Sequence, residues 1–157
     1  MADRGCGAGD IKEYLERSAY QSSIYVAVNS LKYLKKSGRV TASAAVVAGM
    51  LNIKPVLTIQ GEKLDLFTKV RGMKQSGKKM VEAVKVDIAS RFGEIAADRI
   101  RIGAAGTFEK EEDAGWWLEM VRETFPDTEV YYTPLSCSIA CHVGIGSVGI
   151  GVCVVSE

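Results

Sequence analysis

The chain has 157 residues, of which 47% are hydrophobic and 25% charged, as expected for one globular domain with a single core. Its 20 basic and 19 acidic side chains give a net charge of +1, which offers neither the basic surface that nucleic acid requires nor a polybasic membrane patch. We find no signal-peptide pattern and no apolar run of the ~20 residues that a membrane span requires. We therefore expect a cytoplasmic protein with no nucleic-acid partner and no membrane span.

Helix and strand patterns alternate from the start of the chain. We expect residues 1–9 to be a leader that is disordered or foreign to the native protein, and a helix to begin near Asp10, where an acidic cap is followed by Glu three positions later. β-branched and aromatic residues predict a strand over 23–28, and helical spacing follows over 30–36. Small and apolar residues then predict a helix over 42–51 that is buried on most sides and leaves volume for a ligand.

The middle of the chain predicts a hairpin and a long helix. Alternating side chains indicate two strands, 55–59 and 64–70, joined by a polar turn. An apolar stripe from Met73 to near Gly93 predicts a long helix whose charged side faces solvent.

The last part of the chain alternates strand and helix again. We predict strands over 99–105, 129–133 and 148–155, and helices from Ala114 to before Pro126 and over 136–141. The sum is about six strands and six helices in one domain, 10–157. Because strand-helix-strand units mix with a hairpin, we expect an α/β or α+β fold with a mixed, roughly six-stranded sheet packed with helices.

The only histidine, His142, opens a glycine-rich run that ends at Gly151. Histidine is the side chain whose charge changes near neutral pH, and glycine lets a backbone or a ligand approach closely. Residues 144–149 match the dinucleotide pattern G-x-G-x-x-G, but that motif works between a strand and a helix, and here the chain ends soon afterwards. We interpret the match as a coincidence, and the glycines as bringing a loop close to a ligand or a helix.

The chain has four cysteines, which are too few and too clustered for a disulfide framework, so we expect free thiols. Cys137, Cys141 and His142 have spacing that a metal site could use, but no fourth ligand is evident, and we favour buried, unreactive thiols. Cys141 and His142 are neighbours that point in different directions on a helix, which argues against a nucleophile pair.

Two loops allow a structural and a functional interpretation. Arg39 and Thr41 stand between predicted helices, where they could cap the helices or form an anion site. Asn52 follows the apolar helix, where it could end that helix or contact a ligand.

Four segments, in this order, resemble the signature of the DegV family: LKKSGRV at 34–40, LNIKPVLT at 51–58, KVRG at 69–72 and HVGIG at 142–146. The resemblance implies a non-enzymatic component that binds a long-chain fatty acid in an apolar tunnel, with no cofactor, no metal and no catalytic residue. It further implies that the carboxylate is presented to a fatty acid kinase catalytic subunit, which makes acyl phosphate for phospholipid synthesis. Family proteins carry two domains, and this chain resembles the second; the N-terminal domain, whose hydroxyl residues hold the carboxylate, has no counterpart before Asp10.

The resemblance also implies a binding site. We expect His142, with Gly144 and Gly146, to face the head group, and Arg39 and Arg71 to order the tunnel mouth. The other expected ligand contacts are Thr41 and Asn52 near the mouth and Ala45, Val46, Met50 and Leu51 along the acyl chain.

Two other functions stay open. Kinship between the DegV family and the dihydroxyacetone-binding subunit of dihydroxyacetone kinases suggests a subunit that binds a small carbonyl compound covalently through His142. A domain that merely pairs with another chain, as a homodimer for example, would instead show self-association.

Overall fold

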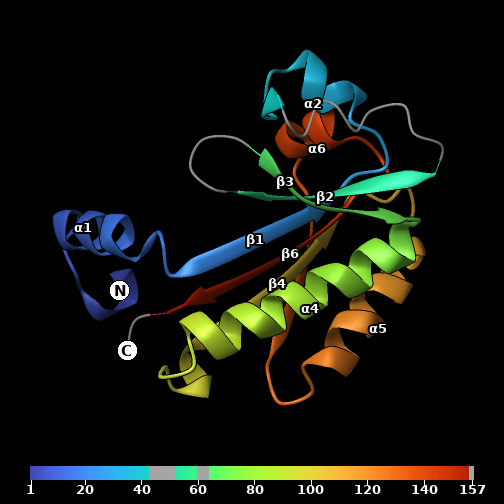
Figure 1. Ribbon diagram of the computed structural model, residues 1–157. Helices are drawn as coiled ribbons and strands as arrows, with labels where there is room; N and C mark the ends of the chain where they lie inside the picture. The colour runs from blue at the N-terminus through green and yellow to red at the C-terminus, as the bar shows by residue number, and fades with distance from the viewer. Residues whose placement is uncertain (43–51, 60–63, 156–157) are drawn as a thin grey trace.

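The computed structural model describes residues 1–42, 52–59 and 64–155, which form a six-stranded mixed sheet with helices on both faces (Figure 1). The strands are β1 Ser22–Ala27, β2 Ile53–Ile59, β3 Leu64–Arg71, β4 Ile100–Gly106, β5 Val130–Pro134 and β6 Val148–Val154. The helices are α1 Ala8–Ser18, α2 Lys32–Lys36, α4 Met73–Arg91, α5 Gly115–Thr124 and α6 Cys137–Val143, with short 3-10 helices at Ala2–Arg4, Ala97–Arg99 and Glu111–Ala114.

The sheet has the strand order β3-β2-β1-β6-β4-β5. Only β4 and β5 pair in parallel among these strands, because α5 carries the chain back between them, and the other pairs are antiparallel. The predicted α/β fold with a mixed sheet is therefore confirmed, and β2 with β3 forms the predicted hairpin. The chain places its first and last strands side by side at the centre of the sheet, with Ser22 opposite Cys153.

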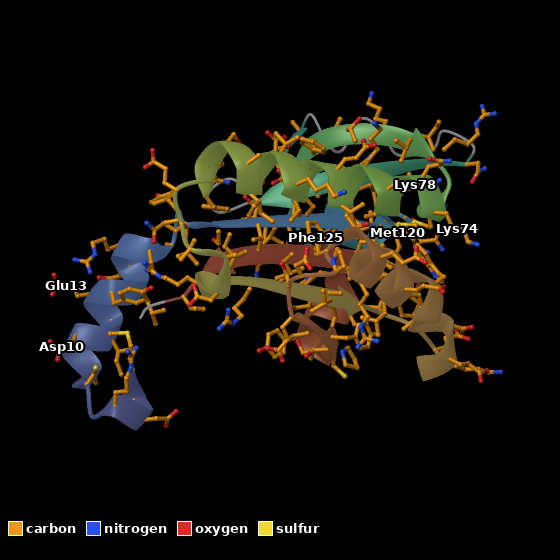
Figure 2. The ribbon with its side chains drawn as sticks, turned by 90° about the horizontal axis from the view of Figure 1, so that it is seen from below. Asp10, Glu13, Lys74, Lys78, Met120 and Phe125 are labelled. Atoms are coloured by element: carbon orange, nitrogen blue, oxygen red, sulfur yellow. The ribbon has the colours of Figure 1, made fainter. Side chains whose placement is uncertain are left out.

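One face of the sheet holds the larger core, under α4 and α5 (Figure 1). Alternate residues of β6, namely Val148, Ile150 and Val152, point into it, as the two-residue period of a strand requires. Trp117 of α5 is fully buried there, and its indole N–H donates to the Gly149 carbonyl at 3.2 Å. Helices α4 and α5 pack closely at Gly77, where an added Cβ would lie 3.1 Å from the Met120 sulfur (Figure 2).

The opposite face carries a smaller core at one end, under α2 and α6 (Figure 1). Its buried members are Val28, Leu31, Leu34, Leu57 and Val143. The small core joins the two helices to the β2–β3 hairpin, and it positions the site described below.

Element boundaries agree with the predictions within a few residues, except at the start of the chain, where two points differ. Helix α1 begins at Ala8, with Gly7 as its N-cap; Asp10 is the third residue of the helix, and its carboxylate accepts the Gly7 N–H at 3.2 Å. The expected leader 1–9 therefore includes a 3-10 helix and the start of α1. From residue 43 on, the helix predicted over 42–51 lies outside the described residues.

Helix α1 extends away from the sheet, and none of its residues is buried (Figure 2, where Asp10 and Glu13 mark it). Leu15 is 59% exposed on it. The core of the domain thus begins at β1.

Candidate functional site

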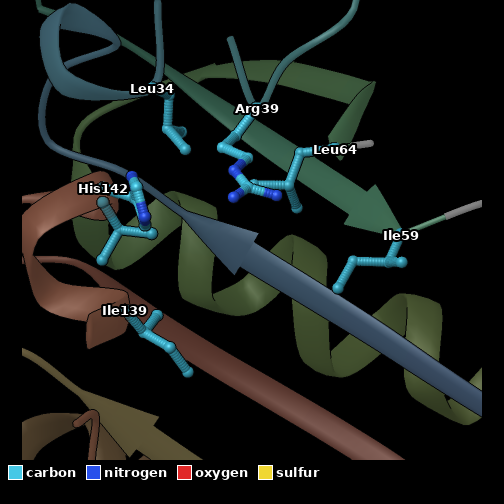
Figure 3. A pocket seen from close by; sticks show the side chains of 7 residues that line it. Leu34, Arg39, Ile59, Leu64, Ile139 and His142 are labelled. Atoms are coloured by element: carbon cyan, nitrogen blue, oxygen red, sulfur yellow. The ribbon is translucent and has the colours of Figure 1, made fainter. Parts of the chain in front are cut away.

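A pocket of about 290 Å³ lies between α2, α6 and the end of the hairpin at which β2 ends and β3 begins (Figure 3). Apolar side chains form most of its described lining, and two polar ones, Arg39 and His142, join them. The apolar members are Leu34, Ile59, Leu64, Ile139 and Val143. An apolar concavity with a few convergent polar groups is the usual form of a small-molecule site.

The pocket has a fixed side and an accessible side. Leu34 is 1% exposed and Val143 is 4% exposed, because both belong to the smaller core. Ile59 and Ile139 are 41% and 45% exposed, which is unusual for isoleucine in a folded domain. Burial of these two side chains by an apolar ligand is therefore favourable.

Arg39 reaches the pocket from the segment after α2. Gly38 has φ of +65° and turns the chain out of the helix. The Leu64 N–H then donates to the Arg39 carbonyl at 3.0 Å, and the Thr41 N–H donates to the Leu64 carbonyl at 3.0 Å. These bonds fix the backbone of Arg39 against the start of β3, so that its guanidinium lies across the pocket from α6 (Figure 3).

His142 lies near the C-terminal end of α6, with its ring turned toward the pocket (Figure 3). Within the part of the chain that the structure describes, neither its ring nor the Arg39 guanidinium has a hydrogen-bond or ion-pair partner. Two donor side chains without protein acceptors therefore converge in an apolar pocket, an arrangement that suits an anionic ligand group.

The glycines after His142 have a steric role. Gly144 has φ of 78° and ψ of 171°, a conformation that is essentially restricted to glycine. An added Cβ there would lie 2.9 Å from the Tyr33 ring of α2, and one at Gly146 would lie 3.4 Å from the Asn29 amide. The groups that approach Gly144 and Gly146 closely are the side chains of Tyr33 and Asn29. Neither glycine is part of the described pocket lining.

Two buried hydroxyls hold this loop, and sequence reasoning missed both. Thr107 follows β4 and donates to the Gly144 carbonyl at 2.6 Å, while its oxygen accepts the Ser147 N–H at 3.0 Å. The Ser147 hydroxyl lies 2.9 Å from the Val143 carbonyl, to which it donates. Only the pairing of β4 with β6 brings these distant residues together.

The LNIKP segment also has a structural role. Lys54 donates to the Asn29 carbonyl at 3.1 Å and to its side-chain oxygen at 2.6 Å. Asn29 in turn contacts Gly146, so this segment and the glycine loop meet outside the pocket.

Three predicted contacts, Thr41, Asn52 and Arg71, are not part of the described pocket lining. Thr41 donates its hydroxyl to Asp65 at 2.6 Å, which attaches the Arg39 segment to β3. Asn52 has φ of 57° and, like Arg71, is exposed at the opposite end of the hairpin, where its carbonyl accepts the Gly72 N–H. Arg71 is separated from Leu64 by the length of β3, about 23 Å, so the geometry does not support a role for Arg71 at the pocket mouth.

Other predictions concern residues elsewhere. Ala45, Val46, Met50 and Leu51 lie outside the described residues. The expectation of buried thiols is wrong for Cys137 and Cys141, because both are exposed on α6, although all four cysteines are free. Over residues 1–42, 52–59 and 64–155, no group of three or more histidine, cysteine or acidic side chains is placed to hold a metal ion. No helix in those ranges has the length and hydropathy of a membrane span.

The structure is thus an α/β domain with a mixed sheet and an apolar pocket on which two donor side chains converge. A family model described as "Uncharacterised protein, DegV family COG1307" matches residues 1–155, and the chain belongs to the DegV family. The protein YqaC of Lactococcus lactis, a DegV domain-containing protein, is 30% identical over 156 residues, which are 97% of this chain and 52% of that one. A DegV domain-containing protein of Clostridium perfringens is 28% identical over 151 residues, which are 96% of this chain and 50% of that one.

Solved structures share the fold. A fatty acid binding DegV family protein from Streptococcus agalactiae superposes with a TM-score of 0.79 at 23% identity, covering 99% of this chain and 52% of that one. A stearic acid-binding protein from Eubacterium ventriosum superposes with a TM-score of 0.82 at 20% identity, covering 98% of this chain and 52% of that one. The chain thus spans about half the length of the relatives it matches.

Proposed function

We propose that this chain is the tunnel-bearing part of a fatty-acid carrier, and that its pocket holds the carboxylate end of a long-chain fatty acid. The observation that carries the proposal is the convergence of Arg39 and His142 on a pocket otherwise lined by aliphatic side chains. The structural relatives described as fatty-acid-binding proteins support the same ligand class.

The energetics favour this ligand. A carboxylate that leaves water unpaired costs several kcal/mol, so it requires the donors that Arg39 and His142 provide. A charge-assisted hydrogen bond contributes about 1.5–3 kcal/mol. Each methylene placed among the aliphatic side chains adds about 0.8 kcal/mol.

The carrier role extends the proposal. Arg39 is exposed, and His142 is partly exposed, so a carboxylate between them stays accessible from outside. We propose that a kinase catalytic subunit phosphorylates it there: the carboxylate oxygen attacks the γ-phosphorus of ATP on the kinase, and ADP leaves. In a protein of the relatives' full length, a second domain would add hydroxyl donors to the carboxylate.

The test compares fatty-acid binding by the wild type and by charge-neutral variants, using native mass spectrometry and calorimetric titration with palmitate. Arg39→Gln and His142→Asn each remove one donor group or its charge, and we expect each to weaken binding by about tenfold or more. Arg71→Gln is the matched control, because it removes the same charge at the far end of the hairpin. The alcohol of the same chain length should bind all of these proteins alike.

Equal losses in Arg39→Gln and Arg71→Gln would contradict the pocket, and an absence of palmitate binding by the wild type would contradict the function. The carbonyl-binding alternative makes a different prediction, an intact-mass increase with dihydroxyacetone that His142→Ala abolishes. The aliphatic lining is a poor match for so polar a ligand.

A further inference from the structure

Two thiols lie one turn apart on the outer face of α6. Cys137 is the first residue of the helix and Cys141 is the fifth, and both are exposed. Residues four apart in a helix lie on the same face. The inner face directs Ile139 and His142 into the pocket and Val143 into the smaller core (Figure 3). Neither cysteine is part of the described pocket lining, so the thiols form a feature separate from the proposed fatty-acid site.

The side chain of Cys141 points back along the helix toward the turn that contains Cys137. Its sulfur lies 3.1 Å from the Ser138 carbonyl oxygen, to which the thiol donates. Long side chains in helices generally lean toward the N-terminus over the preceding turn, and this contact follows that rule. The Cys141 sulfur therefore lies over the first turn of α6, which includes Cys137.

The spacing of the two thiols suits a shared ion better than a disulfide. Cβ atoms one helical turn apart are separated by about 5–6 Å. A disulfide requires Cβ atoms about 3.5–4.5 Å apart, so it would force the turn to close or unwind. An ion between the sulfurs adds two metal–sulfur bonds, each about 2.3 Å long in zinc sites, and so spans the wider separation.

Two thiolate ligands select a narrow class of ion. Thiolates bind soft metals, namely Cu(I), zinc and the iron of iron–sulfur clusters. Structural zinc is held by four ligands, and iron–sulfur clusters are held by four cysteines. Over the ranges that the structure describes, no further histidine, cysteine or acidic side chain joins the two thiols in a group of three. The pair matches Cu(I), because two sulfur ligands complete the linear coordination of this ion.

We propose that Cys137 and Cys141 form a binding site for a single Cu(I) ion, held between their sulfurs on the outer face of α6. The thiolate, not the thiol, is the metal ligand, so both thiols lose their protons to solvent as the ion binds. The product is a dithiolate complex with a net charge of −1, and no electron is transferred. This site is independent of the proposed fatty-acid function.

The experiment uses the full chain with Cys6→Ser and Cys153→Ser, which leaves the two thiols of α6 as the only ones in the protein. Cu(I) is added without oxygen, in ascorbate, in competition with the chromogenic Cu(I) chelator bicinchoninate. We expect native mass spectrometry to show one copper ion per chain, and an unbuffered titration to show two protons released for each ion bound. Excess Zn(II) should not displace the copper, because the pair supplies too few ligands for zinc.

Cys137→Ser and Cys141→Ser in this background each leave a single thiol. We expect each to lower the affinity for Cu(I) by about 100-fold or more, because the second ligand no longer acts at a high effective concentration. His142→Asn is the control on α6, since its ring is turned toward the pocket, and we expect it to keep the affinity for Cu(I) (Figure 3). Thermal melts establish that the variants fold.

Three outcomes would overturn the proposal. Equal affinity for Cu(I) in the two-thiol protein and in either single-thiol variant would show that the sulfurs do not act together. A loss in His142→Asn as large as in Cys141→Ser would show a three-ligand site that includes the pocket. A mass decrease of two hydrogens without retained copper would show a disulfide. Palmitate titration of the same proteins tests the fatty-acid function separately, so failure of one proposal leaves the other standing.

Discussion

Two hydroxyls outside the four motif segments, those of Thr107 and Ser147, hold the loop that follows His142 in place. Ser147 is fully buried and Thr107 is 8% exposed, and their hydrogen bonds connect the end of α6 to the end of β4. A strand prediction gives the positions of β4 and β6 in the chain, but it does not give their register. The contact between residues 107 and 147 therefore could not be predicted from local pattern.

We predict that Thr107→Val lowers the free energy of unfolding by about 1–3 kcal/mol, because it leaves the buried Ser147 N–H without its acceptor. Urea denaturation measures this loss, and palmitate titration of the folded variant shows whether His142 has moved. Thr107→Ser keeps the hydroxyl and should preserve most of the affinity. A Thr107→Val protein with unchanged stability and affinity would contradict the role given to this residue.

Only some of the residues of the candidate site could be predicted from the sequence. The resemblance selects His142 and Arg39, and the structure brings both to one pocket. The same resemblance selects Arg71, yet the full length of β3 separates it from that pocket, because Arg71 lies at the other end of the hairpin, beside Asn52. Ile59 and Ile139 line the pocket, but nothing in their sequence context distinguishes them from core isoleucines.

At the scale of elements, α4 is attached to β1 by a polar cluster within an apolar interface. Tyr25 donates its hydroxyl to Asp87 at 2.7 Å, and Arg91 donates to the Tyr20 carbonyl at 2.7 Å and to the Ser23 hydroxyl. Burial, and then the hydrogen bond to Asp87, raise the pKa of Tyr25 well above its usual range.

This raised pKa predicts a loss of stability in alkali. Below pH ~10 Tyr25 is protonated in both states, and its contribution is complete; at higher pH the unfolded chain releases the proton while the folded chain keeps it. The free energy of unfolding should therefore fall as the pH rises above ~10. Urea denaturation at neutral pH and at alkaline pH measures the slope.

Tyr25→Phe should lower stability at neutral pH by about 1 kcal/mol and should flatten the alkaline decline. Tyr20→Phe is the control, because Tyr20 is 83% exposed and only its backbone carbonyl contacts Arg91. An alkaline slope that is the same in Tyr25→Phe as in wild type would show that other groups cause the decline.

The elements themselves followed from sequence pattern more closely than their arrangement did. Two-residue alternation predicted β3, and an apolar stripe with a charged reverse side predicted α4, since both patterns follow from burial on one face. The start of α1 was shifted because Gly7, which lacks a capping side chain, is the N-cap and receives its acceptor from Asp10.

At the scale of the whole molecule, the mixed sheet could be predicted, but its strand order could not. The strand order depends on which strands, distant in the sequence, pair with each other, and local periodicity does not contain that information. The structure places β6 between β1 and β4, so the last strand of the chain completes the centre of the sheet.

This arrangement predicts unequal effects of truncation. Deleting residues 1–18 removes η1 and α1, which bury no residue in the core, and should leave the melting temperature nearly unchanged. Deleting residues 148–157 removes β6, the strand that pairs with both β1 and β4, and should abolish cooperative unfolding. Circular dichroism melts compare the two, and a cooperative transition in the second variant would show that the sheet can close without β6.

The central position of β6 also affects how the protein is made. On the ribosome, β1 emerges before β2 and can pair with it, but its other edge stays open until β6 follows, on the order of ten seconds later at ordinary rates of synthesis. An open, apolar strand edge is a template for pairing with other chains. Substitutions that weaken the β1–β6 pairing should therefore reduce the yield of newly made protein more than they lower the stability of molecules that have already folded.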